Sequence, residues 1–163
     1  MKRKSNIMSL VTAAMIAALY VVLSFAIRLL GLDSGAIQVR VSEALTILPY
    51  FTPAAIPGLF IGCLLSNVMT GCALPDIIFG TLATLIGAVF TRKLRRYKWL
   101  APIPPILSNA VIVPFVLLYA YGIKPLWFSF VTVTAGEIIS CGVLGMILLF
   151  SLQKYANRIF TVQ

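Results

Sequence analysis

The stretch from residue 44 to residue 91 constrains this chain most, because its 48 residues contain a single charged side chain, Asp76. One helical crossing of a bilayer uses about 20 apolar residues, so this stretch is too long for one crossing. The whole chain has only 10% charged residues, whereas a soluble domain has about 25%. We therefore expect an integral membrane protein in which all 163 residues form a single membrane domain.

The basic residues indicate which ends of the crossings face the cytoplasm. Ten of the thirteen form three groups, which are Lys2, Arg3 and Lys4, then Arg92, Lys93, Arg95, Arg96 and Lys98, and finally Lys154 and Arg158. Basic groups beside apolar segments stay on the cytoplasmic side. This placement explains the net charge of +9 without nucleic acid, since no aromatic-interleaved basic surface accompanies it. The first apolar run continues to Ile27, too far for a cleaved signal peptide, so we expect it to stay attached.

The number of crossings follows from the same groups. The N-terminus and the basic group at 92–98 should both be cytoplasmic, so an even number of crossings must separate them. One crossing precedes the apolar stretch, which must then supply three short ones. We predict an all-α bundle of six transmembrane helices, short or broken after the first, with both termini cytoplasmic. The predicted crossings are about 7–30, 42–50, 53–69, 75–91, 101–121 and 126–152.

Closely spaced prolines interrupt the stretch 38–62 at Pro49, Pro53 and Pro57. Each proline removes a backbone donor and clashes with the preceding helical turn. In a membrane such irregular backbone is tolerated only where protein or a water-filled cavity satisfies the freed groups. We therefore predict a short helix, a turn and a returning helix that form a ligand site or its scaffold. Pro75 is expected to open the next helix, where its missing donor costs nothing.

Glu137 is the most informative single residue, because it lies eleven residues past Leu126, about 16 Å into the last crossing. An ionised carboxylate at that depth costs at least about 2.5 kcal/mol, so such a residue faces the bundle interior and marks a functional site. The alternative is that Glu137 pairs with Asn109 for bundle specificity, while aromatic residues anchor the lipid interface. Five residues of this crossing recur at spacings of three and four and so lie on one helical face. They are Trp127, Phe130, Thr134, Glu137 and Cys141.

Asn109 and the charged residues of the outer half complete the candidate ligand site. The amide of Asn109 is at a similar depth to Glu137, where it either recognises the edge of a heterocycle or satisfies a buried carboxylate. Asp76 and Glu43 begin helices, where the helix dipole favours negative charge. Arg40 either pairs with Glu43 or contacts a polar ligand. We place Arg40 and Glu43 at the outer rim of a pocket whose floor is Glu137 and Asn109.

Small residues mark one side of the first helix, namely Ala13, Ala14, Ala17 and Ala18. Two pairs spaced by four residues lie on adjacent faces and allow another backbone to approach closely. One interpretation is packing inside the bundle. The other is a docking face for a partner membrane protein.

Several kinds of chemistry are missing from the sequence. It contains no Gly-x-x-x-x-Gly-Lys-Ser/Thr phosphate loop, so any use of ATP must belong to another chain. It has no histidine, and Cys63, Cys72 and Cys141 lack the spacing of a metal site, so we expect no metal and no cofactor. Without a recognisable nucleophile and base, we expect no enzyme.

The segment 40–63, RVSEALTILPYFTPAAIPGLFIGC, resembles the queuosine-precursor transporter family (QueT), and the resemblance continues more loosely through PDIIFGTLAT at 75–84. Members of that family are substrate-binding S components of energy-coupling-factor (ECF) transporters. The resemblance implies a multi-pass protein of the bacterial plasma membrane that captures a deazaguanine base from outside. It also implies docking, through alanines of the first helix, on a transmembrane coupling protein driven by two cytoplasmic ATPases. The outer loop at 31–41 would then help to close the pocket.

The chemistry of a deazaguanine suits the candidate residues. Its adjacent N–H donors fit a carboxylate such as Glu137 or Glu43, its carbonyl needs a donor such as Asn109 or Arg40, and its ring can stack on an aromatic side chain. Trp127 and Phe130 are the aromatic candidates, and Asp76 suits an aminomethyl cation on the base. Two alternatives stay open, an S component for another vitamin and a proton-coupled secondary carrier that uses Glu43, Asp76 and Glu137.

Overall fold

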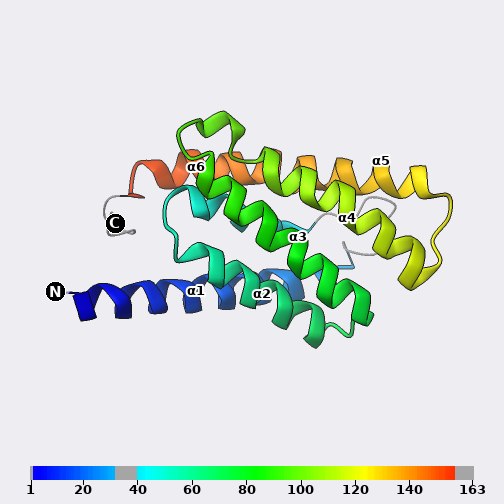
Figure 1. The fold of residues 1–163 in the computed structure, drawn as a ribbon, viewed down its shortest axis with the longest axis horizontal. Helices are drawn as coiled ribbons and strands as arrows, with labels where there is room; N and C mark the ends of the chain where they lie inside the picture. The colour runs from blue at the N-terminus through cyan, green and yellow to red at the C-terminus, as the bar shows by residue number, and fades with distance from the viewer. Residues whose placement is uncertain (1, 32–39, 157–163) are drawn as a thin grey trace.

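The computed structural model describes residues 2–31 and 40–156, and these residues are helical with no strand among them. The helices, in chain order, are α1 (Lys2–Leu29), η1 (Val41–Tyr50), α2 (Ala55–Met69), α3 (Leu74–Lys93), η2 (Lys98–Leu100), α4 (Ile103–Tyr121), α5 (Leu126–Glu137), η3 (Ile138–Leu144) and α6 (Gly145–Gln153) (Figure 1). The all-helical prediction is therefore confirmed. Most of the predicted outer loop at 31–41 lies outside the described residues.

Four helical segments are long and apolar enough to cross a membrane, namely Asn6–Leu29, Leu74–Lys93, Lys98–Tyr121 and Leu126–Gln153. The helix α2 is apolar but has only 15 residues. As expected, Pro75 lies in the first turn of α3. The predicted last helix is continuous in path but changes type, because α5 passes through the π-helix η3 before α6.

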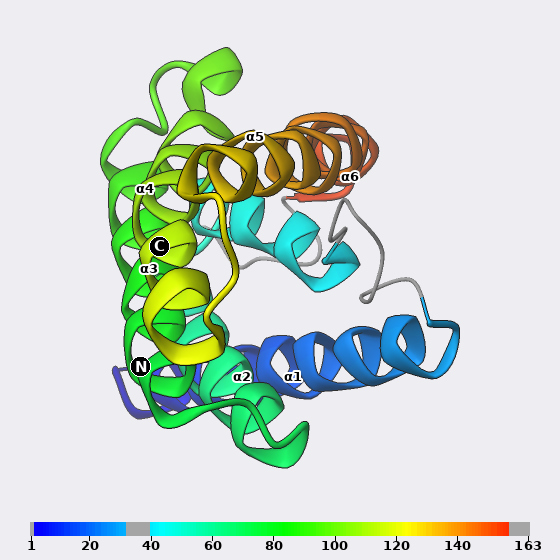
Figure 2. The same ribbon diagram turned by 90° about the vertical axis from the view of Figure 1, so that its right-hand side faces the viewer.

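The proline-rich stretch forms the centre of the molecule. The element η1 is a 3₁₀-helix of ten residues, and every residue from Ser42 to Pro49 is buried. With a rise of about 2.0 Å per residue it is roughly 20 Å long. Figure 2 shows η1, in cyan, between the pair α1 and α2 and the pair α5 and α6, and it also contacts α3. The backbone that the prolines make irregular is thus enclosed by protein on all of these sides, as a membrane requires.

Arg92, at the end of α3, holds the C-terminal end of η1. Its Nη1 donates hydrogen bonds to the carbonyl oxygens of Pro49 at 3.2 Å and Tyr50 at 3.3 Å. The last carbonyls of a helix have no partner within the helix, and a cation near them also suits the helix dipole. The basic residue therefore has a structural role in addition to its charge.

Small residues bring α1 and α2 together. A Cβ atom on Gly58 would lie 2.6 Å from the carbonyl oxygen of Ala13, and one on Gly62 would lie 3.0 Å from the Cα of Ala17. These distances are too short for any side chain at either glycine, so only glycine permits this approach. Ala13 and Ala17 therefore serve packing inside the bundle.

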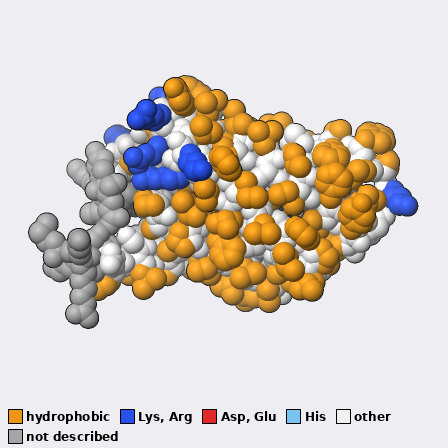
Figure 3. Space-filling model, in the orientation of Figure 1, with side chains coloured by type: hydrophobic (Ala, Val, Ile, Leu, Met, Phe, Trp, Pro, Cys, Tyr) orange, Lys and Arg blue, Asp and Glu red, His pale blue; other side chains and the backbone are white. Residues whose placement is uncertain are grey.

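Most of the basic side chains visible in Figure 3 gather at one end of the bundle. The start of α1, the end of α6 and the connection between α3 and α4 lie at the same end (Figure 1). Figure 3 shows Lys and Arg side chains clustered there, while the sides of the visible face are largely hydrophobic. An apolar belt with a basic end is the arrangement of a membrane protein.

Candidate functional site

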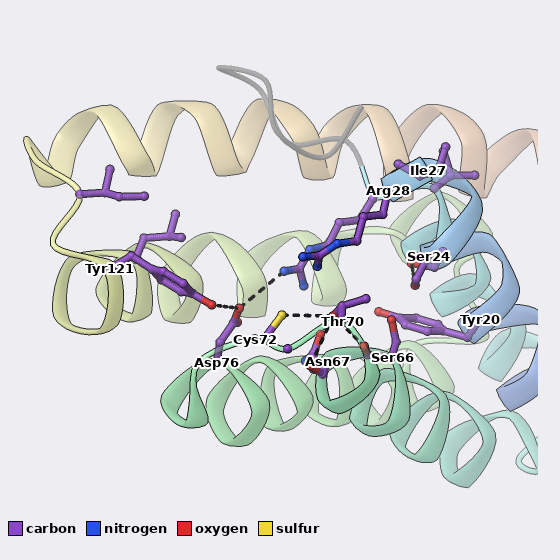
Figure 4. Close-up of a pocket in the computed structure, with 16 residues that line it drawn as sticks. Tyr20, Ser24, Ile27, Arg28, Ser66, Asn67, Thr70, Cys72, Asp76 and Tyr121 are labelled. Atoms are coloured by element: carbon purple, nitrogen blue, oxygen red, sulfur yellow. Dashed lines mark hydrogen bonds and ion pairs between the residues drawn. The ribbon is translucent and has the colours of Figure 1, made fainter. Parts of the chain in front are cut away.

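An open pocket of about 280 Å³ lies at the end of the bundle opposite the basic residues. Its walls come from the C-terminal part of α1, the start of η1, the end of α2, the start of α3 and the end of α4. This volume is at the small end of the range of about 300–1,000 Å³ that is usual for small-molecule sites. Its polar lining includes Tyr20, Arg40, Ser66, Asn67, Asp76 and Tyr121 (Figure 4).

Asp76 is the central charged group of this pocket. It is 4% exposed and lies in the first turn of α3. Arg40 Nη2 lies 3.9 Å from Asp76 Oδ2, and the Tyr121 hydroxyl donates a hydrogen bond to the same oxygen at 3.3 Å. The Tyr121 oxygen in turn accepts from the Ala73 backbone N–H at 3.0 Å. The second oxygen, Oδ1, is buried and has no hydrogen-bond partner among the described residues.

The other polar walls of the pocket are mostly satisfied. Ser24 Oγ donates to Ser42 Oγ at 2.9 Å, which joins α1 to the start of η1. Thr70 Oγ1 donates to the carbonyl oxygen of Ser66 at 2.7 Å. Asn67 Nδ2 lies 3.6 Å from Cys63 Sγ, a weak contact that leaves amide capacity.

A second polar region lies deeper, and we call it the buried carboxylate cluster: Glu43, Asn109, Glu137 and Cys141. Glu43 is 1% exposed and accepts a hydrogen bond from the Tyr20 hydroxyl. Thr84 Oγ1 donates to Glu43 Oε1 at 3.5 Å, and Asn109 Nδ2 donates to Oε2 at 3.5 Å. Both carboxylate oxygens of Glu43 are therefore occupied by protein donors.

Glu137 and Cys141 complete this cluster from the other side. Cys141 Sγ lies 3.2 Å from Glu137 Oε2 and 3.4 Å from the backbone carbonyl oxygen of Glu43. One ligand atom from each of Glu43, Glu137 and Cys141 lies within 4.8 Å of the other two. Two carboxylates at this distance repel each other when both are ionised. The spacing would also suit a metal ion, so the expectation of no metal stays a prediction.

Glu137 and Cys141 both reach the cluster because they lie four residues apart on one face of the last helix, at the junction of α5 with the π-helix η3. It begins at Ile138, directly after Glu137, and contains Cys141. Single π-helical turns widen an α-helix and are frequent at functional sites. The element η3 contacts η1, which carries Glu43.

Comparison with known proteins identifies the family. The family model described as "QueT transporter" matches residues 10–154, most of the chain. This chain belongs to the QueT transporter family. It is also 39% identical, over 102 residues, to the "Queuosine precursor transporter QueT" of Lactococcus lactis subsp. cremoris (strain MG1363), and the match covers 60% of each chain. No solved structure matches it. The chain thus belongs to a transporter family, and its long apolar helices suit a membrane protein.

In this QueT family member the predicted charged site residues and Asn109 fall into the two polar regions. Arg40 and Asp76 line the open pocket. Glu43, Asn109 and Glu137 meet in the buried carboxylate cluster, where Asn109 contacts both acids. The placement of Glu43 at the outer rim is wrong, because Glu43 is 1% exposed, does not line the open pocket and is hydrogen-bonded by Tyr20 inside the bundle. Arg40 forms its ion pair with Asp76, not with Glu43.

The predicted aromatic stripe on the last helix is partly wrong. Trp127 is 67% exposed and does not face the interior. Phe130 is half-buried and packs edge-on against Phe115, with ring centroids 5.6 Å apart, and Thr134 is also half-buried. The fully buried positions of this helix are instead Ser129, Val133, Gly136, Glu137, Ser140 and Cys141. The inward face is thus rotated by about one residue from the predicted one.

Sequence reasoning missed several uncharged residues of the site. Tyr20 lines the open pocket and also donates to Glu43, and Tyr121 and Asn67 line the pocket. A signal for Tyr20 was available, since it continues the buried spacing of Ala13, Ile16 and Ala17. A tyrosine on such an inward stripe needs a partner for its hydroxyl. The other two residues have no comparable pattern.

The alanines of α1 divide between two environments. Ala13 and Ala17 are buried against α2, whereas Ala14 and Ala18 are exposed. All four line an apolar groove of about 520 Å³ between α1 and α2. Ala13 and Ala17 therefore have the internal packing role. Docking on a partner protein stays a prediction for Ala14 and Ala18.

Proposed function

We propose that this protein is the substrate-binding S component of an ECF-type importer and that its ligand is a queuosine precursor, a deazaguanine base. The observation that carries the proposal is the open pocket, which presents a guanidinium, a carboxylate and amide and hydroxyl groups in a member of the QueT transporter family. A small planar heterocycle with several hydrogen-bonding groups suits such a lining. The name of the Lactococcus relative supports the choice of substrate.

The proposed topology is six crossings in the bacterial plasma membrane, with both termini cytoplasmic. Four long apolar helices supply four crossings, and η1 and α2 supply two short ones. The basic end of the bundle then faces the cytoplasm, in accordance with the positive-inside rule. The open pocket faces outside, where a scarce base is captured.

The energy for transport comes from other chains in this proposal. The sequence has no phosphate loop, so a transmembrane coupling protein and two cytoplasmic ATPases are required. The exposed alanines Ala14 and Ala18, in the apolar groove beside α2, offer the coupling protein a close approach.

A proton-coupled secondary carrier is the second candidate function. It is favoured by the closeness of Glu43 and Glu137, since buried acids near one another are common in proton relays. The two functions differ in their energy source. Uptake by cells that lack the partner ATPases, driven by a proton gradient alone, would support the carrier and contradict the ECF proposal.

Ligand binding by the purified full chain tests the substrate. A deazaguanine base at a concentration of 100 times Kd should stabilise the folded protein by about 2.7 kcal/mol, seen as a higher unfolding temperature in detergent. Thiamine, biotin and riboflavin serve as controls and should leave the unfolding temperature unchanged. Stabilisation by one of these vitamins, and not by the deazaguanine, would contradict the proposed substrate.

A further inference from the structure

We propose that the Arg40–Asp76 pair of the open pocket recognises the guanine-like edge of the ligand, with Asp76 as the specificity-determining residue. The inference rests on the proposed function for the identity of the ligand. It assigns recognition to the pocket wall and not to the buried carboxylate cluster.

The first observation is the spare capacity of the Asp76 carboxylate. Asp76 lines the pocket, and its oxygen Oδ1 is buried beside Gly80 with no hydrogen-bond partner among the described residues. Its other oxygen accepts one hydrogen bond, from Tyr121 at 3.3 Å. An ionised carboxylate can accept about four hydrogen bonds, and a buried acceptor without a donor is unfavourable. Asp76 is therefore prepared to accept N–H groups from a ligand.

The second observation is the loose contact between Asp76 and Arg40. The distance from Arg40 Nη2 to Asp76 Oδ2 is 3.9 Å, whereas a direct charge-assisted hydrogen bond is about 2.7–2.9 Å. The ion pair sets the two groups side by side but does not use up their hydrogen bonds. The guanidinium has five N–H donors, so it retains several for a ligand carbonyl.

The order of these groups matches a guanine-like edge. Such an edge presents a carbonyl acceptor, a ring N–H donor and an exocyclic NH₂ donor in a row. Arg40 followed by the two oxygens of Asp76 supplies one donor and two acceptors in the complementary order. An adenine-like edge would bring its amino group against the guanidinium and its ring nitrogen against the carboxylate. Both contacts would be repulsive, so the pair also excludes the wrong base.

The rest of the pocket suits the flat ring of the same ligand. The side chains of Ile27, Leu117 and Ile123 supply apolar walls beside the charged pair. Gly80 leaves room for the carboxylate, because a Cβ atom there would lie 3.0 Å from Asp76 Oδ1. Apolar walls with a few placed polar groups are typical of small-molecule sites.

The buried carboxylate cluster is a weaker candidate for this role. Both oxygens of Glu43 are already bonded by Tyr20, Thr84 and Asn109. Glu137 is contacted by Cys141. Neither acid lines the open pocket. A ligand would have to break existing hydrogen bonds to reach them.

Calorimetric titration of the purified full chain tests the proposal with two ligands, 7-deazaguanine and its analogue without the 2-amino group. The wild-type protein should bind 7-deazaguanine at least about tenfold more tightly than the analogue, since a hydrogen bond to a charged group contributes about 1.5–3 kcal/mol. Asp76→Asn should lower the affinity for 7-deazaguanine by roughly 10- to 100-fold. It should also reduce the preference between the two ligands to less than about threefold, because an amide cannot accept both N–H groups.

The possible outcomes separate this inference from the proposed function. If the wild-type protein binds 7-deazaguanine and Asp76→Asn keeps the full preference for the 2-amino group, recognition lies elsewhere and the inference is overturned. A wild-type protein with equal affinity for the two ligands also overturns it, while the proposed function stands. A wild-type protein that binds no deazaguanine overturns both.

A second pair of variants decides the matter if Asp76→Asn does not fold. Arg40→Met removes the donor proposed for the carbonyl, and Arg28→Met removes another guanidinium that lines the same pocket. Arg40→Met should lower the affinity for 7-deazaguanine at least about tenfold, and Arg28→Met less than about threefold. Equal losses would show that pocket charge alone attracts the ligand and would overturn the inference.

Discussion

The open pocket and the buried carboxylate cluster both contain acids in a chain with only four, yet they differ in how those acids are bonded. Glu43 in the cluster has three side-chain donors, Tyr20, Thr84 and Asn109. Asp76 in the pocket has one oxygen with no partner among the described residues. A deep position in the bundle therefore indicates that an acid is held by other side chains. Unused hydrogen-bonding capacity in a residue that lines a cavity indicates a ligand contact.

The two regions share one residue. Tyr20 lines the open pocket and donates its hydroxyl hydrogen bond to Glu43. A change in the pocket can therefore reach the cluster through a single side chain. Together with its donors Tyr20 and Thr84, the cluster joins α1, η1, α3, α4 and the last helix. It would therefore connect the pocket to most of the bundle.

Removal of the central acid of the cluster gives the largest expected effect. Glu43→Ala leaves the donors Tyr20, Thr84 and Asn109 unpaired in the interior, at a cost of about 1–3 kcal/mol for each group. We expect the free energy of unfolding in detergent to fall by roughly 3 kcal/mol or more. Asp76→Ala is the matched control and should cost less, because Arg40 and Tyr121 are partly exposed to water. A larger loss of unfolding free energy for Asp76→Ala than for Glu43→Ala would contradict the difference in bonding between the two acids.

Tyr20→Phe should have the next largest effect, because it removes the hydroxyl that joins the two regions. Loss of a hydrogen bond to a charged group should lower the free energy of unfolding by about 1.5–3 kcal/mol. Ligand affinity should change less than about threefold, since the hydroxyl is already used by Glu43. Tyr121→Phe is the control in the pocket, where the hydroxyl is near solvent and the loss of stability should stay below about 1 kcal/mol. Equal losses of unfolding free energy in Tyr20→Phe and Tyr121→Phe would mean that the two hydroxyl hydrogen bonds contribute equally to stability.

Gly80→Ala should weaken ligand binding in the pocket and leave the stability of the fold nearly unchanged. The added Cβ would lie 3.0 Å from Asp76 Oδ1 and displace the carboxylate, while alanine favours the helix by about 1 kcal/mol relative to glycine. We expect ligand affinity to fall roughly three- to tenfold with little change in unfolding temperature. In Gly142→Ala, the control in η3, the added Cβ would lie 3.7 Å from Ile138 Cγ2, an ordinary contact, so binding should not change. A full-affinity Gly80→Ala protein would remove Asp76 from the ligand site.

The smallest expected effect is that of Glu137→Gln on binding. The substitution keeps the size of the side chain and an oxygen that can accept from Cys141. Because Glu137 does not line the open pocket, ligand affinity in a titration should change less than about twofold. A tenfold loss would show that the ligand reaches the buried carboxylate cluster and would merge the two regions into one site.

The helices could be predicted from the sequence because their ends have local causes. Pro75 begins α3, and the basic residues Arg92 and Lys93 end it. Gly122, with φ of 67°, ends α4 in the left-handed conformation that glycine allows. The helical type could not be predicted in the same way, because the 3₁₀ form of η1 and the π form of η3 depend on the neighbours that enclose them.

The charged part of the candidate site could also be predicted, because ions are rare in this chain. Arg40, Asp76, Glu43 and Glu137 all lie in one of the two polar regions. Trp127 was assigned wrongly because aromatic residues suit both an interior face and the lipid interface. Tyr121 and Asn67 were missed because neutral polar residues near helix ends are compatible with many surroundings.

The sequence alone determined that this protein is a helical membrane protein with its basic residues at one end, because hydrophobicity and proline act locally and through the bilayer. Only the tertiary structure decided that Glu43 is deep and that Arg40 faces Asp76. The reason is that η1 starts at the open pocket and continues into the bundle, so Arg40 and Glu43, three residues apart, belong to different polar regions. Hydrogen-bond partners in both regions come from helices far apart in the chain, and their distances exist only once the helices have packed.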